Sequence, residues 1–190
     1  MEEINPWKTI NSKKIHETPW ISINHHDVIN PAGNNSVYTT VNFKNKAIGI
    51  LPIDFEGNVY LVGQFRYPTN EYSWEIPEGG GPMDEDALDS AKRELKEETG
   101  ITAKNWQLFS EFNTSNSVTD EHAYLFLAQD LTFGESNPEE NEKLQVMKIG
   151  FNEAIDMVVN GKIKDSLTIV SLLLTKELVS RGKINYLPTK

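Results

Sequence analysis

The feature that most constrains this chain is a patterned, charged segment at its centre, residues 79–101. Strong helix formers fill positions 84–99, with acids in the first turn and Gly100 after the last residue, so a helix is predicted there. A narrow apolar stripe at helical spacing should face the core: Leu88, Ala91 and Leu95. With its spacing the segment is written Gly79-x5-Glu85-x7-Arg93-Glu94-Leu95-x-Glu97-Glu98-x-Gly100-Ile101.

Three glutamates are predicted to share one face of this helix. Glu94, Glu97 and Glu98 are spaced i, i+3 and i+4, so their carboxylates project from the same side. Crowded like charges destabilise a helix, and Mg²⁺ prefers oxygen ligands of this kind. The pattern therefore indicates a metal site in a cleft, with a solvated acidic face as the alternative interpretation.

The complete spacing matches the Nudix box at nine specified positions within twenty-three residues. The chain therefore resembles the Nudix hydrolases, and a chance match of this length is improbable on spacing alone. The resemblance implies an α/β (α+β) fold: an α/β/α sandwich with a mixed central sheet, joined here by an N-terminal antiparallel sheet.

The resemblance also implies roles for the box residues. Glu94 and Glu98 would be the main ligands of Mg²⁺, or of Mn²⁺, with Glu97 assisting and the backbone carbonyl of Glu78 completing the set. Arg93 would orient a box glutamate, and Glu97 lies one helical turn away. Such ions neutralise the pyrophosphate oxygens and activate a water molecule.

Segments beside the box resemble the ADP-ribose and nucleotide-sugar pyrophosphatases. The resemblance is carried by Gln-Phe-Arg-Tyr-Pro at 64–68 and Trp-Glu-Ile-Pro-Glu-Gly-Gly at 74–80. It implies that Arg66 contacts substrate phosphates and that Glu75 aids metal or substrate binding; a surface salt bridge is the alternative for Arg66. The predicted reaction is cleavage of a nucleoside diphosphate sugar to a nucleoside monophosphate and a sugar phosphate.

Two loops bear on catalysis and specificity. The acidic segment 134–142 matches a loop of these enzymes that supplies the catalytic base, so Glu140 is predicted as that base, with Glu142 the close alternative. Asn116 stands where typical ADP-ribose pyrophosphatases carry a proline. That departure widens the candidate substrates to ADP-glucose, GDP-mannose and UDP-glucose, whose hydroxyls Asn116 and its polar neighbours would bind.

The N-terminal region, residues 1–45, is predicted to serve dimerisation and base binding, and residues 46–190 to form the Nudix hydrolase domain. Related enzymes are homodimers that share an N-terminal sheet, so a homodimer is predicted. Trp20, or else Trp7, is the candidate to stack on the base, although a core or interface position is equally compatible with either.

The remaining pattern places strands before the central helix and both strands and helices after it. Alternating or continuous apolar runs predict strands, and glycine or aspartate at the ends predicts helix boundaries. The predicted strands are 20–29, 37–43, 47–53, 59–65, 106–112, 123–128 and 144–149, and the further helices are 152–160 and 165–180.

Composition excludes several classes of function. The formal net charge of −10 disfavours duplex nucleic acid as a partner, since such binding neutralises phosphates with basic residues. No apolar run approaches the roughly 20 residues of a membrane span, and the absence of cysteine excludes disulfides and thiolate metal sites. A cytoplasmic location is expected. Two rival functions remain: hydrolysis of another nucleotide, such as NADH or a dinucleoside polyphosphate, and a non-catalytic nucleotide sensor.

Overall fold

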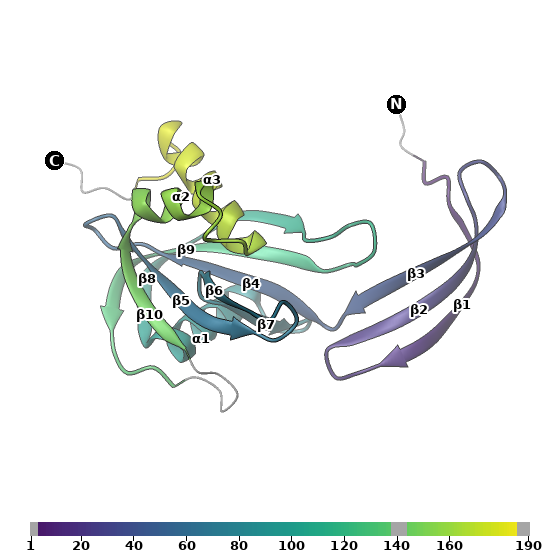
Figure 1. The fold of residues 1–190 in the computed structure, drawn as a ribbon, viewed down its shortest axis with the longest axis horizontal. Helices are drawn as coiled ribbons and strands as arrows, with labels where there is room; N and C mark the ends of the chain where they lie inside the picture. Colours follow the sequence, from purple (N-terminus) through teal and green to yellow (C-terminus); the bar gives the residue numbers. More distant parts are fainter. Residues whose placement is uncertain (1–3, 138–143, 186–190) are drawn as a thin grey trace.

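The computed structural model describes residues 4–137 and 144–185, which form three sheets and three helices (Figure 1). The strands of the first half are β1 (Lys8–Glu17), β2 (Ile21–Ile29), β3 (Asn35–Phe43), β4 (Asn45–Pro52), β5 (Asn58–Arg66), β6 (Glu71–Glu75) and β7 (Glu78–Pro82). The second half contains α1 (Ala87–Thr99), β8 (Ile101–Asn113), β9 (His122–Phe133), β10 (Gln145–Gly150), α2 (Phe151–Val159) and α3 (Ser166–Ser180).

The central sheet has the strand order β7-β4-β9-β8 and is mixed, as predicted. Strand β4 runs parallel to β9, whereas the β4–β7 and β8–β9 pairs are antiparallel. Ile48, Ile50 and Leu51 of β4 are completely buried, because helices cover both faces of the sheet. This agrees with the continuous apolar run seen in the sequence.

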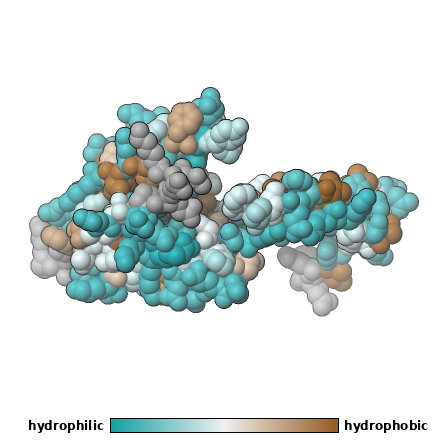
Figure 2. Space-filling view, turned by 90° about the horizontal axis from the view of Figure 1, so that it is seen from below, coloured by the Kyte–Doolittle hydropathy of each residue, from teal (hydrophilic) through white to brown (hydrophobic). Residues whose placement is uncertain are grey.

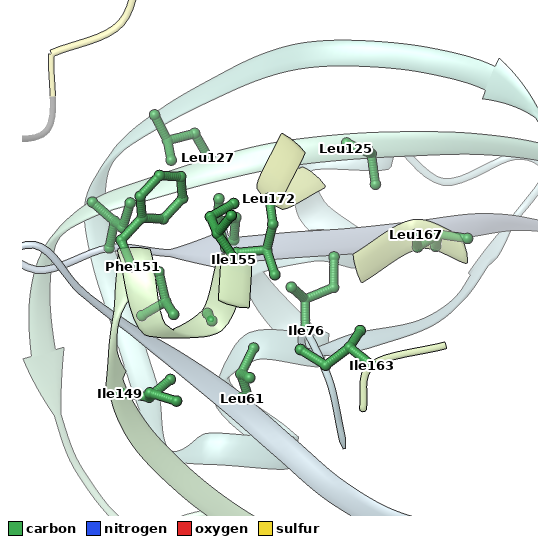
Figure 3. Packing of buried hydrophobic residues seen from close by; sticks show 14 of the residues in the cluster. Leu61, Ile76, Leu125, Leu127, Ile149, Phe151, Ile155, Ile163, Leu167 and Leu172 are labelled. Carbon is green, nitrogen blue, oxygen red and sulfur yellow. The ribbon is translucent and has the colours of Figure 1, made fainter. Parts of the chain in front are cut away.

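One face of the core lies beneath α2 and α3, which also cover the second sheet, β10-β5-β6 (Figure 3). Leu61, Ile76, Leu125, Phe151 and Leu172 meet there, and each is at most 3 % exposed. Burying an apolar side chain of this size contributes about 1.5–3 kcal/mol. This cluster therefore fixes the start of α3 against the sheet.

The opposite face of the central sheet lies beneath α1. Ala91 and Leu95 are fully buried against Ile50 and Phe126, and Leu88 packs at the edge of the same cluster. The apolar stripe predicted for this helix is therefore confirmed, as is the α/β/α fold. Within the described ranges, no helix has both the length and the apolar character that a bilayer crossing requires.

The N-terminal strands form a separate antiparallel sheet, β1-β2-β3, which stands out from the body as an arm (Figures 1 and 2). Every residue of β1 is exposed. The arm is attached through the loop between β8 and β9. The backbone N of Val41 donates to the carbonyl of Val118 at 2.9 Å, and the backbone N of Phe43 donates to Asp120 Oδ1 at 2.8 Å.

Several predicted boundaries are wrong. Strand β8 begins at Ile101 instead of residue 106, and β9 ends at Phe133 instead of residue 128. The central helix begins at Ala87 instead of residue 84, because Asp86 adopts an extended backbone and caps it, accepting from the backbone N of Leu88. Residues 78–82 are not among the predicted strands, but they form β7 and pair with β4. Strands β1 and β6 were not predicted, since neither shows a clear apolar alternation.

Two glycines with similar backbones test the packing at the end of α1. Gly100 has φ +71°, and a methyl group there would overlap the backbone carbonyl of Gly134; Gly161 has φ +69° and open space around it. We expect Gly161→Ala to cost about 1–2 kcal/mol and Gly100→Ala about 3 kcal/mol or more. Equilibrium urea unfolding measures both, and equal losses would contradict the close packing seen at Gly100.

Candidate active site

Several of the predicted site residues gather in a cleft between the first residues of β4, strand β7, α1 and the start of α3. A hollow of about 520 Å³ is lined by Trp20, Arg66, Glu78 and Asp165, among others. It adjoins a hollow of about 510 Å³ that includes Glu94 and reaches the outer face of α1. The cleft therefore extends from the N-terminal arm to α1, the helix of the Nudix-like box (the box helix).

Strand β7 lies so close to α1 that side chains are excluded from two of its positions. A methyl group on Gly79 would overlap the carboxylate of Glu94, and one on Gly81 would lie 2.6 Å from Ser90 Oγ. The backbone N of Glu78 donates to Glu98 Oε2 at 3.0 Å. The glycines thus allow the box carboxylates to touch the backbone of β7.

Arg93 is held on the outer side of the box helix by two glutamates. Its Nη1 lies 2.7 Å from Glu94 Oε1 and 3.0 Å from Glu97 Oε2, and its Nη2 donates to the carbonyl of Gly80. Partial burial lowers the pKa of Arg93, but the charges of Glu94 and Glu97 outweigh it, so the pKa is raised. Glu97 is within reach as predicted, and Glu94 is a second partner.

Arg66 is the last residue of β5, and its side chain extends into the cleft. It forms ion pairs with two carboxylates. Its Nε donates to both oxygens of Glu75 at 3.0 Å, and its Nη2 lies 2.6 Å from Glu75 Oε2 and from Glu78 Oε1. Burial alone would lower the pKa of the guanidinium, but these acids raise it. Arg66 therefore stays charged, and its Nη1 has no partner among the described residues.

Glu78 lies at the bottom of the cleft, with 15 % of its side chain exposed. Its Oε2 is buried and finds no hydrogen-bond partner among the described residues. Burial, followed by the nearby charges of Asp165 and Glu75, raises the pKa of this carboxyl well above its ordinary value of 4.5. A cation beside Glu78 would relieve this unfavourable environment.

The residues fit a divalent cation. In the described ranges, oxygens of Glu75, Glu78 and Asp165 lie within 4.8 Å of one another, and Glu94 and Glu97 border the neighbouring hollow. Hard cations prefer such oxygen donors, and the orphaned Glu78 oxygen marks a place where positive charge is favoured. This cluster of three acids differs from the predicted set of metal ligands, because it contains no residue of α1.

The structure gives less support to the roles predicted for four other residues. Trp20 lines both hollows of the cleft and is 67 % exposed, so a face is open to a ligand. Asn116 lines a different hollow, beside Trp7 on the arm, apart from the box residues. Glu140 and Glu142 lie outside the described residues. The roles assigned to all four from the sequence remain predictions.

Sequence reasoning did not place Asp165 in the cleft, and it named Thr114 and Glu121 only as polar neighbours of Asn116. Asp165 was predicted only as a helix cap, and the cap is present: its Oδ2 accepts from the backbone N of Thr168 at 2.7 Å. Thr114 and Glu121, at the two ends of the β8–β9 loop, also line the cleft and bond each other. Their polar character was visible in the sequence, but their proximity depends on the fold.

Comparison with known proteins agrees with this geometry. The NUDIX domain family matches residues 44–164, and the nucleoside diphosphate sugar hydrolase N-terminal domain family matches residues 7–41. The chain belongs to the Nudix family. The first match covers β7 and α1, and the second covers most of the arm.

Individual relatives place the chain more narrowly. It is 33 % identical to the ADP-ribose pyrophosphatase of Bacillus subtilis, over 93 % of this chain and 97 % of that protein. It is 33 % identical to a GDP-mannose pyrophosphatase of Yersinia pestis, over 62 % and 63 % respectively. The crystal structure of an ADP compounds hydrolase superposes with a TM-score of 0.84 at 20 % identity, covering 97 % of this chain and all of that one, which supports the fold.

The close approach of β7 to α1 predicts that Gly79 cannot carry a side chain. We expect Gly79→Ala to displace the Glu94 carboxylate and to lower turnover and Mg²⁺ affinity by about tenfold or more, since misplaced ligands bind weakly. Gly150→Ala is the control, because that position opens onto free space. Calorimetric Mg²⁺ titration and unfolding of both variants measure this; unchanged affinity in Gly79→Ala would contradict it.

Proposed function

We propose that the protein hydrolyses the pyrophosphate bond of a nucleoside diphosphate sugar, releasing a nucleoside monophosphate and a sugar phosphate. The observation that carries the proposal is the cleft itself. It brings the guanidinium of Arg66 and the carboxylates of Glu75, Glu78 and Glu94 around the glycine-rich strand β7. A site with both cationic and metal-binding groups suits an anionic pyrophosphate.

The positions of the residues in the cleft give them separate roles in binding the metal ion and the phosphates. Glu94, Glu97 and Glu98, with the carbonyl of Glu78, would hold Mg²⁺, and Mn²⁺ would fit the same donors. When bound, the ion neutralises phosphate oxygens and activates water. Arg66 presents its Nη1 to a phosphate oxygen while Glu75 holds the guanidinium in place.

Arg93 has a supporting role in this scheme. Its contacts to Glu94 and Glu97 fix the direction in which those carboxylates point. Either Glu140 or Glu142 would remove a proton from the attacking water, as the family resemblance implies. The chain's own carboxylates would thus supply positioning and proton transfer, whereas Arg66 and the cation that the carboxylates hold would neutralise charge.

The sugar nucleotide class is supported by the relatives and by the surroundings of the cleft. Their names include an ADP-ribose and a GDP-mannose pyrophosphatase. Trp20 offers an exposed indole for stacking on a base, and Thr114 and Glu121 offer hydroxyl-binding groups at the cleft edge. ADP-ribose, ADP-glucose and GDP-mannose are the first candidates.

The assay that tests the function measures phosphate released by a coupled phosphatase from ADP-ribose, ADP-glucose, GDP-mannose, UDP-glucose and NADH. We expect turnover of at least one sugar nucleotide with Mg²⁺ and none with EDTA. Glu98→Gln is the control for contaminating enzymes. Its amide oxygen can still accept from the backbone N of Glu78, so the variant should fold, but it should lose about 100-fold or more in turnover.

Turnover of NADH alone would replace the proposed substrate class. If no substrate is hydrolysed but a nucleotide still binds, the protein is a sensor and the proposed reaction is wrong. Equal turnover by wild type and Glu98→Gln would remove the metal role given to Glu98. These outcomes separate the substrate question from the assignment of the ligands.

We also propose that the chain acts as a homodimer joined through the β1-β2-β3 arm. The arm exposes large apolar side chains on a sheet that does not pack on the body: Trp7, Ile10, Ile15 and Val37 are each at least 40 % exposed. Such a surface is typical of an interaction site. Light scattering should give about twice the 21.5 kDa of one chain, and a mass near 21.5 kDa would contradict the dimer.

A further inference from the structure

Asp165 is the N-cap residue of α3 and lines the cleft. Only one of its two carboxylate oxygens accepts hydrogen bonds from the described residues. Its Oδ2 accepts from the backbone N of Thr168 at 2.7 Å and from Thr168 Oγ1 at 2.8 Å. We find no hydrogen bond to Oδ1 within the described residues. Helix capping therefore explains the role of Oδ2 but gives no role to Oδ1.

The cap is tied to the segment that carries the other acids of the cleft. Thr168 Oγ1 also accepts from the backbone N of Ile76 at 2.9 Å, and both residues are fully buried. Ile76 directly follows Glu75 and lies two positions before Glu78. This buried chain of hydrogen bonds fixes the Asp165 carboxylate beside Glu75 and Glu78, with oxygens of all three within 4.8 Å.

The local charge is unbalanced. Glu75 and Glu78 both bind the single guanidinium of Arg66, and Asp165 adds a third carboxyl group that forms no ion pair within the described ranges. Three acids around one cation leave an excess of negative charge, even when one of the three is protonated.

Two hollows meet at this group. The one of about 520 Å³ and a second of about 670 Å³, which extends toward Pro68 and Lys162, share Arg66, Glu78 and Asp165 in their walls. A phosphate that pairs with Arg66 from either hollow therefore comes near the Asp165 carboxylate. Like charges repel appreciably at such separations in a partly buried site, and a divalent cation cancels the repulsion.

We propose that the negative charge of Asp165 makes pyrophosphate binding depend on a bound divalent cation. Without the cation, Asp165 and its two neighbours repel the ligand from Arg66; with it, the same charge strengthens the hold on the cation. The inference rests on the proposed pyrophosphate chemistry and adds a coupling between the two ligands, assigned to a residue outside the Nudix box.

A purely structural role for Asp165 makes a different prediction, and one substitution separates the two. Asparagine caps helices as well as aspartate does, so Asp165→Asn keeps the hydrogen bond to Thr168 while removing the charge. Asp86 caps α1 in the same way, is exposed and lines neither hollow. Asp86→Asn is therefore a matched control for the loss of one charge at a helix cap.

The experiment is calorimetry on the wild type and both variants, with two probes: Mg²⁺ alone, and inorganic pyrophosphate in EDTA. For Asp165→Asn we expect pyrophosphate without metal to bind about three- to tenfold more tightly and Mg²⁺ to bind more weakly by a similar factor. Asp86→Asn should leave both affinities within about twofold of wild type. Thermal unfolding confirms that both variants are folded.

Opposite shifts of the two affinities support the coupling, because a loosened helix would weaken both. Equal weakening of both probes, or no change in either, overturns the proposal. Neither probe contains a nucleoside or a sugar, and neither measurement requires turnover. The coupling can therefore fail while the proposed hydrolysis stands, and the hydrolysis can fail on its substrate panel while the coupling stands.

Discussion

The contact between strand β7 and helix α1 is the constraint on which the site depends. Because Gly79 has no side chain, the Glu94 carboxylate packs directly on the backbone of β7, and Glu98 accepts a hydrogen bond from the backbone N of Glu78. This contact places the box acids beside the first residues of β7, where the side chain of Glu78 forms an ion pair with Arg66. Apolar burial of α1 on one face of the central sheet and of α3 on the other then fixes the two helices that border the cleft.

Much of the fold could be predicted from the sequence, since burial leaves a periodic signal. The apolar stripe of α1 and the continuous apolar run of β4 were read correctly because both elements pack against the core. Strand β7 was missed because its glycines are needed for close approach, and glycine in isolation indicates a break. Strand β1 was missed because every residue in it is exposed, so no face of the strand is marked by burial.

The site was predictable where its residues are close in sequence and less so elsewhere. The spacing of Glu94, Glu97 and Glu98 was compatible with a metal site or a solvated face, and the full box spacing favoured the metal site. Arg93 contacts Glu97, as that spacing predicted. Asp165 could not be assigned to the cleft, because 87 residues separate it from Glu78 and only the fold brings them together. Sequence gave Asp165 a local role as a cap, which is correct but incomplete.

In the proposed mechanism, the box acids and the backbone of β7 together hold a divalent cation for pyrophosphate cleavage. Anomalous diffraction from crystals soaked in Mn²⁺ tests it most directly, because the peak locates the ion without any assay. We expect a peak within about 2.5 Å of carboxylate oxygens of Glu94 and Glu98 and of the Glu78 carbonyl. A fully occupied peak elsewhere, or none in the cleft at saturating Mn²⁺, would contradict it.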